Sequence, residues 1–287
     1  MLFIIFPIWE IKFAKFPMFP SRMKQDARNL GLTLIITAIS GANFFSILMF
    51  WPTQAFNVYG HDPVGVGIRG LPVGFSILAG AVIVLALLSY FRGNNRELLV
   101  VSCIIMTAGC GALAFAERDN MDKLWGILVL AGLGIGGIVV PASVITTIIC
   151  PDDIIATVSA LTLSIRVIGG CIGYTVYYNV FVSYFKKNAV KYIGGQMVQL
   201  GVFNVTYITT AIELTGASLL EELNTIPGLA GNQTAVDMVI YAGQVAYAES
   251  YKYVYLVSIA FGVISIICAC SMGNISKFMD DHVAVVM

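Results

Sequence analysis

Charged side chains are scarce in this sequence of 287 residues. Asp, Glu, Lys and Arg together make up 11% of it and hydrophobic residues make up 58%, whereas an ordinary soluble domain has about 25% charged residues. The formal net charge is +0, so no overall field indicates a nucleic-acid or acidic partner. The composition predicts an integral membrane protein that is surrounded by the lipid bilayer and does not bind nucleic acid.

The sequence also has few groups that perform chemistry. It has two histidines, His61 and His282, which we expect in loops, and its six cysteines lie in or beside apolar segments. It has no H-E-x-x-H or P-loop motif, and "GVGIRG" at 65–70 matches a dinucleotide motif without the strand that such a site needs. We therefore expect that the protein is not an enzyme and has no cofactor and no metal site.

Six apolar segments are long enough to cross a bilayer, whose hydrocarbon core of about 30 Å needs about 20 helical residues. The sequence thus predicts an all-α, polytopic membrane protein built as a six-helix bundle. The predicted spans are residues 29–53, 70–91, 97–117, 124–149, 154–183 and 253–273.

The segments outside these spans have distinct characters. Residues 1–28 are interpreted as the remnant of a preceding helix, "MLFIIF", followed by a basic cytoplasmic linker. Residues 184–252 are predicted to be a long extracellular or lumenal loop, with helical apolar spacing that indicates amphipathic helices. Residues 274–287 are predicted to be a cytoplasmic tail.

Lysines and arginines in the short loops predict the orientation, because cytoplasmic loops carry an excess of them. The side of the two termini has Lys12, Lys15, Arg22, Lys24, Arg28, Arg92, Arg96 and Lys277, and the opposite short loops have Arg69, Arg118 and Lys123. Both termini are therefore expected in the cytoplasm. The long loop then faces outward, where its sequons at Asn204 and Asn232 are candidates for N-glycosylation.

One arginine, Arg166, lies within the apolar stretch "LTLSIRVIGGCIGY" at 161–174. On a helix, one face of this stretch has small and polar residues, and the opposite face has branched apolar ones. We expect the apolar face to contact lipid, so Arg166 points into protein or a water-filled cavity. The polar face consists of Ser159, Thr162, Arg166, Gly169, Gly170, Gly173 and Tyr177.

A charged residue inside a membrane suggests a function and needs a partner, yet no Asp or Glu lies in the middle of any predicted span. The candidate partners are Asn43, Gln54, backbone carbonyls, an anionic substrate, or an acidic residue on helices outside this chain. Two interpretations remain open: Arg166 fastens two helices through carbonyl groups, or it lines a substrate cavity. For the second we predict that the cavity is lined by Arg166, Ser159, Thr162, Tyr177, Asn43 and Gln54.

Glycines at helical spacing predict close helix contacts. Gly169 and Gly173 form a G-x-x-x-G pair with Gly170 beside it, and Gly132 and Gly136 repeat the spacing in the fourth span. We expect these glycines to bring the fourth and fifth spans together. Two interpretations remain open: these glycines only allow close packing, or they also mark a mobile hinge.

Several stretches resemble a known family. "FWPTQAFNVYG", "GLPVGF", "PASVITTIICPDDIIATVSALTLSIRVIGGCIGYTVYYNVF" and "YKYVYLVSIAFGVISIICACSMGNISKFMDDHVAVV" are similar to fungal major facilitators of the trichothecene-efflux-pump type, which resemble fourteen-span drug:proton antiporters. The resemblance covers Trp9 to Met287 and matches the C-terminal six-helix half of the major facilitator fold. It implies a plasma-membrane transporter with a substrate path between two bundles, one of which is absent from this chain.

The resemblance implies proton-coupled efflux of a small organic molecule such as a toxin or drug. An acidic partner of Arg166 is then expected in the missing N-terminal bundle. One alternative is a transporter that takes up siderophores or other metal chelates, which are relatives of these pumps. Another is a truncated membrane fragment that does not transport, or a half that associates with another half.

Overall fold

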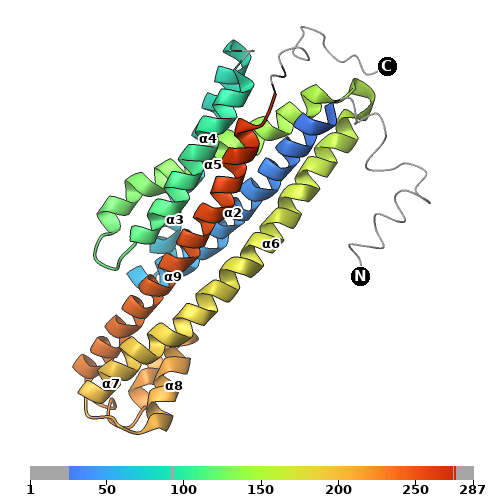
Figure 1. Cartoon of the computed structure of the whole chain (residues 1–287). Helices are drawn as coiled ribbons and strands as arrows, with labels where there is room; N and C mark the ends of the chain where they lie inside the picture. Colours follow the sequence, from blue (N-terminus) through green and yellow to red (C-terminus); the bar gives the residue numbers. More distant parts are fainter. Residues whose placement is uncertain (1–25, 92–93, 274, 276–287) are drawn as a thin grey trace, which may run out of the picture.

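The structure is a computed structural model, which describes residues 26–91, 94–273 and 275. Most of the expected N-terminal remnant and of the cytoplasmic tail lie outside these residues, as does His282. The described residues form helices and connecting turns, without a β-strand among them. The all-helical fold class expected from the sequence is therefore confirmed (Figure 1).

Six of the helices are long and apolar enough to cross a membrane. These are α2 (Ala27–Tyr59), α3 (Pro63–Tyr90), α4 (Asn95–Ala112), α5 (Met121–Ile149), α6 (Ile155–Ala189) and α9 (Gln233–Cys270). The shorter elements are η2 (Leu113–Phe115), η3 (Asp152–Ile154), the π-helix η4 (Val190–Gly194), α7 (Gly195–Gln199), α8 (Val205–Gly216) and η5 (Leu220–Thr225).

Several helices extend beyond the predicted spans. α2 ends at Tyr59 instead of residue 53, and α9 begins at Gln233, well before residue 253. Hydropathy identifies only the stretch that matches the bilayer, whereas a helix continues as long as its backbone is capped and one face is covered. In α9, the side chain of Asn232 caps the first turn, and Ala235 and Val236 are buried. The amphipathic stretch before the last span is therefore the first half of the same helix.

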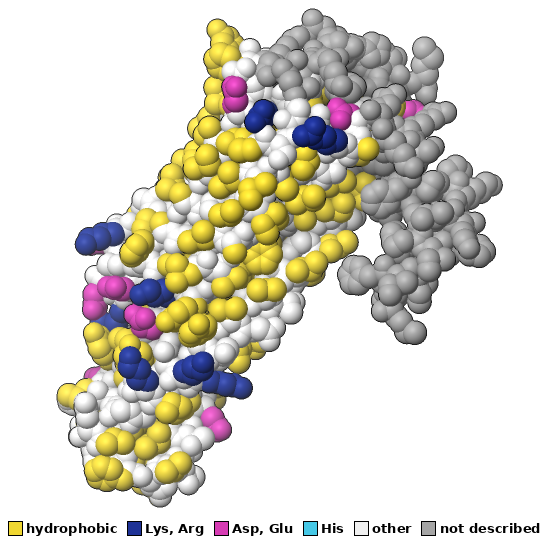
Figure 2. Space-filling view, viewed as in Figure 1, with side chains coloured by type: hydrophobic (Ala, Val, Ile, Leu, Met, Phe, Trp, Pro, Cys, Tyr) yellow, Lys and Arg dark blue, Asp and Glu magenta, His cyan; other side chains and the backbone are white. Residues whose placement is uncertain are grey.

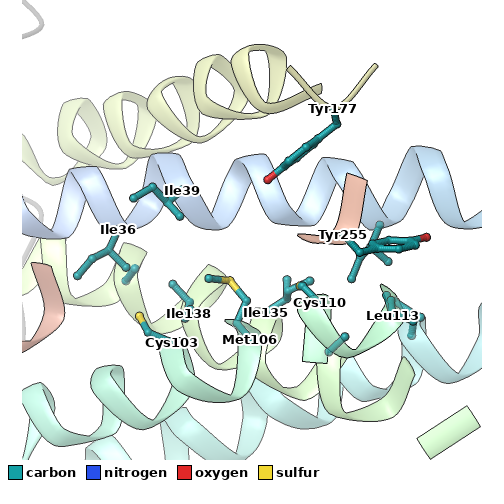
Figure 3. Close-up of a cluster of buried hydrophobic side chains, with 14 of the residues drawn as sticks. Ile36, Ile39, Cys103, Met106, Cys110, Leu113, Ile135, Ile138, Tyr177 and Tyr255 are labelled. Carbon is teal, nitrogen blue, oxygen red and sulfur yellow. The ribbon is translucent and has the colours of Figure 1, made fainter. Parts of the chain in front are cut away.

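The bundle is arranged around α2, which contacts α3, α5, α6 and α9. α3 packs mainly on α5, and α4 lies between α5 and α9. The two least buried spans are α3 and α6, with 28% and 33% of their apolar windows buried inside the protein. Large apolar side chains are exposed on the outer surfaces of both helices. Figure 3 shows part of the bundle core, where Ile36, Met106, Ile135 and Tyr255 come from four different helices.

Glycines allow several of these helices to approach closely, but with partners other than those expected. Gly169 faces the backbone of Ala38 and Gly173 faces Ala42, both on α2, while Gly170 lies against the ring of Phe45. The glycines of the fourth span face α3 instead, where Gly132 lies against Ser76 and Gly136 against Ile77. The expected glycine contact between the fourth and fifth spans is wrong, because spacing identifies a small face but not the helix that covers it.

Residues 189–239, which we name the helical cap, have a hydrophobic core of their own at one end of the bundle (Figure 1). This core includes Ala189, Ile193, Met197, Val202, Ala211, Leu223, Ile226, Leu229, Ala235, Val236 and Val239. The cap is joined to the bundle where Ser218 Oγ donates to Asn57 Oδ1 at 2.7 Å and Tyr247 Oη donates to the carbonyl of Gly216 at 3.0 Å. The long loop is thus a packed helical structure.

Candidate functional site

Arg166 lies on the buried face of α6 with 9% of its surface exposed. Its Nη2 donates to the backbone carbonyl of Val139 and to Ser143 Oγ, the latter at 2.9 Å, so the guanidinium contacts α5. Ser143 Oγ also donates to the carbonyl of Val139 at 3.2 Å. A carbonyl oxygen has two lone pairs and accepts both bonds. Arg166 therefore connects α6 to one turn of α5.

The backbone of Arg166 is also enclosed by α2. Gly41 of α2 lies so close to the carbonyl of Arg166 that a side chain at Gly41 would collide with it. The arginine thus occupies a narrow space bounded by α2 on one side and α5 on the other. The contact with α2 fixes the backbone of α6 at this residue, and the hydrogen bonds to α5 orient the guanidinium.

The hydrogen-bonding capacity of Arg166 is only partly used. A guanidinium has five N–H donors, and its Nε is buried without a hydrogen-bond partner among the described residues. The recorded partners of its Nη2 are uncharged oxygens of α5, and within the described residues no carboxylate forms an ion pair with it. The site thus offers a positive charge and at least one unused donor to a further acceptor.

A second polar contact links α5 and α6 one turn away from Arg166. The hydroxyls of Thr162 and Thr146 are 3.0 Å apart and both side chains are fully buried. Ser159, on the same face of α6, is partly exposed. Together with Arg166 and Ser143, the two threonines form a polar seam between the two helices.

Tyr177 and Asn43 form a separate buried pair between α6 and α2. Tyr177 Oη donates to Asn43 Oδ1 at 2.9 Å, and Asn43 Nδ2 contacts Met106 Sδ at 3.7 Å. In Figure 3 the hydroxyl of Tyr177 points from α6 toward α2 and the buried cluster. The ring of Tyr177 packs against Phe261 with centroids 5.6 Å apart. The pair satisfies both partners inside the apolar core.

Gln54 lies three turns further along α2 and has a different partner. Its Oε1 accepts a hydrogen bond of 2.6 Å from Tyr255 Oη of α9, and both side chains are fully buried. Its Nε2 is buried without a partner among the described residues. The residues predicted to share a cavity are thus divided among three contacts: a seam at Arg166 and Thr162, a pair at Asn43, and a pair at Gln54.

A small pocket lies where the cap meets the bundle, and His61 is part of its wall. Asn57, Thr215, Gln244 and Tyr247 also line it. The Nε2 of His61 is buried without a hydrogen-bond partner among the residues described, and burial lowers the pKa of this imidazole below its usual value. Over the described part of the chain, no group of three or more His, Cys, Asp or Glu is placed to hold a metal ion.

Comparison with known proteins identifies the family of this bundle. The family model "Fungal trichothecene efflux pump (TRI12)" matches residues 2–287. The chain belongs to the fungal trichothecene efflux pump family. Its relatives include efflux pumps and MFS-type transporters, and with its six apolar helices the chain is an integral, multi-pass membrane protein of this transporter family.

Individual relatives match over much of the chain. The "Trichothecene efflux pump TRI12" of Fusarium sporotrichioides is 24% identical over 285 residues, which is 98% of this chain and 47% of that protein. The protein of the same name from Trichoderma arundinaceum is 24% identical over 88% of this chain and 42% of its own length. The "Efflux pump bfoC" of Aspergillus brasiliensis is 30% identical over 56% of this chain and 29% of its own. The chain spans about half the length of the trichothecene efflux pumps it matches.

Some polar residues that form contacts inside the bundle were not identified from the sequence. Ser143 and Thr146 lie three residues apart in "PASVITT" and contact Arg166 and Thr162. The three-residue spacing of this pair indicates that both side chains share one face of a helix, but any helix with a small polar face has the same spacing. Tyr255 has no such signal, because its aromatic ring fits the apolar spacing of α9 and its hydroxyl meets Gln54 only in the folded bundle.

Proposed function

We propose that this chain is the C-terminal half of a secondary active transporter that exports a small organic molecule, such as a toxin or drug, in exchange for protons. The observation that carries the proposal is Arg166, a buried cation within a span of a chain from an efflux-pump family. Insertion of an arginine at the middle of a membrane helix costs about 2.5–3.5 kcal/mol. A residue with that cost needs a role beyond packing.

The depth of Arg166 supports a role in the transport path. It is the twelfth residue of α6, so it lies about 16 Å along the helix at 1.5 Å per residue. Arg166 is therefore about three turns inside the apolar stretch of α6, in a chain of a class whose members bind substrates within the membrane. In this proposal the positive charge of Arg166 attracts an acceptor on the substrate or a carboxylate from another bundle.

The exposed surfaces of α3 and α6 support an association with a second bundle. These helices have the lowest buried fractions of the six spans, and the chain spans about half the length of its relatives. An N-terminal bundle that covers α3 and α6 would place Arg166 close to the interface between the halves. Thr162, Tyr177, Asn43 and Gln54 would then support the path by holding α6, α5, α2 and α9 in register. Ser159, which is partly exposed, would border the path.

The first test is to read the full-length transcript and to express the protein that it encodes in a yeast strain without its own drug pumps. We expect the message to encode further membrane spans upstream of residue 1. The cells should accumulate less of a labelled trichothecene than control cells, and a protonophore should abolish this difference. Equal accumulation with and without the protein would contradict efflux, and insensitivity to the protonophore would contradict proton coupling.

The same strain distinguishes the alternatives. If the protein raises the uptake of a ferric siderophore and leaves the trichothecene unaffected, the direction and substrate class proposed here are wrong. If the message begins at residue 1 and neither compound moves, the chain is a membrane fragment without transport activity.

A further inference from the structure

The helical cap lies at the end of the bundle opposite the first turn of α2 and the last turn of α9 (Figure 1). Arg118 Nε donates to Gln244 Oε1 at 2.6 Å, and Asn188 Nδ2 donates to Ser250 Oγ at 3.0 Å. These bonds place the charged α4–α5 connection and Lys187 at the level of residues 244–250 of α9. Figure 2 shows hydrophobic and uncharged atoms across the middle of the visible face and charged side chains toward its ends. A membrane belt bounded by charges fits this distribution.

The length of α9 places the start of the helix far outside this belt. From Ser250 to Cys270 the helix rises about 30 Å at 1.5 Å per residue, which matches the hydrocarbon core of a bilayer. From Ser250 back to Asn232 it rises about 27 Å more. Asn232 and the cap therefore stand clear of the membrane surface, where soluble or membrane-bound enzymes of that compartment reach them.

Two exposed asparagines of the cap lie in N-x-T sequences, Asn204-Val-Thr206 and Asn232-Gln-Thr234. Each one caps a helix: Asn204 Oδ1 accepts from the backbone N–H of Thr206 at 2.9 Å, and Asn232 Oδ1 accepts from that of Ala235 at 3.1 Å. Both bonds use Oδ1, so they leave Nδ2, the atom that accepts a glycan, directed elsewhere. The two threonine side chains are exposed as well.

The chain has a third such sequence at the other end of α9, Asn274-Ile-Ser276. It begins four residues after Cys270, where α9 ends at the end of the bundle away from the cap. If the excess of Lys and Arg on that side marks the cytoplasm, the cap faces the lumen of the endoplasmic reticulum during synthesis. The sequence thus contains two acceptor sites on one side and an internal control on the other.

We propose that Asn204 and Asn232 are N-glycosylated and that Asn274 is not. The co-reactant is a lipid-pyrophosphate-linked oligosaccharide of the endoplasmic reticulum. Asparagine Nδ2 loses a proton and forms a bond to the anomeric carbon of the sugar, while the bond from that carbon to the pyrophosphate breaks and the lipid pyrophosphate leaves. The proposal fixes the cap as lumenal and both chain termini as cytoplasmic, and it does not depend on transport activity.

The experiment translates the whole 287-residue chain with endoplasmic-reticulum microsomes and treats the product with endoglycosidase H. We expect two steps of slower gel mobility that the enzyme removes. Thr206→Ala should remove one step, Thr234→Ala the other, and the double variant both. These substitutions abolish the acceptor sequence yet keep each capping asparagine, because the caps bond to backbone N–H groups.

Matched variants separate glycosylation from misfolding. Thr206→Ser and Thr234→Ser keep the acceptor sequence and should retain both steps, and Asn274→Gln should leave the pattern unchanged. Absence of any product sensitive to endoglycosidase H overturns the proposal. A step that disappears in Asn274→Gln also overturns it, because that result places the cap in the cytoplasm.

Discussion

Tyr177 on α6 donates a hydrogen bond of 2.9 Å to Asn43 on α2, and both side chains are buried within the bundle. The bond joins two helices that also meet through Gly173 and Ala42. Because α2 contacts four of the other long helices, this pair helps to set the position of α6 relative to the rest of the bundle. Its removal affects both the fit of the core and the hydrogen bonding of Asn43.

Tyr177→Phe should destabilise the bundle by about 1 kcal/mol, in line with hydrogen bonds between membrane helices. The phenylalanine fills the same space but leaves Asn43 Oδ1 without its donor. Adding Asn43→Leu removes the orphaned acceptor, so the double variant should lose less than the sum of the single variants. Thermal unfolding of all four proteins in detergent measures this coupling. Strictly additive losses would contradict the pairing.

Arg166→Ala should lower efflux by the complete transporter at least about tenfold, the effect of losing about 1.4 kcal/mol of favourable interaction. Arg166→Lys should retain an intermediate activity, because an ammonium keeps the charge but lacks the planar fork that meets Val139 and Ser143. Accumulation of labelled substrate and the amount of protein at the cell surface are measured together.

The matched control for Arg166 is Ser164→Ala on the exposed face of α6, where the serine hydroxyl donates to the carbonyl of Ala160 in its own helix. This variant should keep normal efflux. Normal efflux by Arg166→Ala at normal surface amounts would show that the arginine only fastens helices. Loss of the protein from the surface would show that its role is structural.

Gly169→Ala should destabilise the contact between α6 and α2 by about 1–3 kcal/mol, the usual penalty for overpacking. Gly169 faces the backbone of Ala38, which yields less easily than a flexible side chain. Gly126→Ala on α5 is the control, because no described residue outside the adjacent turns of α5 comes within 4 Å of the added Cβ. Thermal midpoints in detergent should fall for Gly169→Ala and stay unchanged or rise for Gly126→Ala. Equal midpoints would contradict the close helix contact.

The folded protein should lose stability as the pH falls from about 7.5 to 5.5, in part through His61. Burial lowers the pKa of His61 in the folded state, so the unfolded chain binds a proton at a higher pH than the folded one. The stabilising contribution of the buried, neutral His61 is therefore present above the ordinary histidine pKa near 6.5. It is lost as the pH falls below that value toward the lower pKa of the folded state. His61→Gln should reduce the change in thermal midpoint over this range. An unchanged pH dependence in His61→Gln would contradict this role.

Much of the membrane bundle followed from the sequence, because hydropathy and the 3.6-residue period depend on local composition. The six spans were found, and Arg166 lies on the buried face of α6. The helix boundaries in the cap were harder to predict. Hydropathy indicated a loop before residue 253, whereas α9 begins at Gln233, where Asn232 caps its first turn and Val239 is buried.

The partners of the polar residues could not be predicted in the same way. Any helix with a small face suits the glycines of α6, and α2 rather than α5 covers them. Among the candidate partners of Arg166, the sequence offered carbonyl groups without naming one; the carbonyl of Val139 is chosen by the crossing of α5 and α6. Asn43 and Gln54 were candidate partners of Arg166 because no acidic residue lies within the spans. In the folded bundle each accepts a hydrogen bond from a tyrosine hydroxyl instead, Asn43 from α6 and Gln54 from α9.

α9 runs without interruption from Gln233 in the cap to Cys270 at the opposite end of the molecule. A straight helix of 38 residues behaves as a lever. When the part of α9 inside the bilayer tilts, the start of the helix in the cap moves by a distance proportional to the length of helix outside the bilayer. A fluorophore or antibody fragment attached to the cap would therefore report angular movements of α9 from outside the membrane, without a label near Arg166.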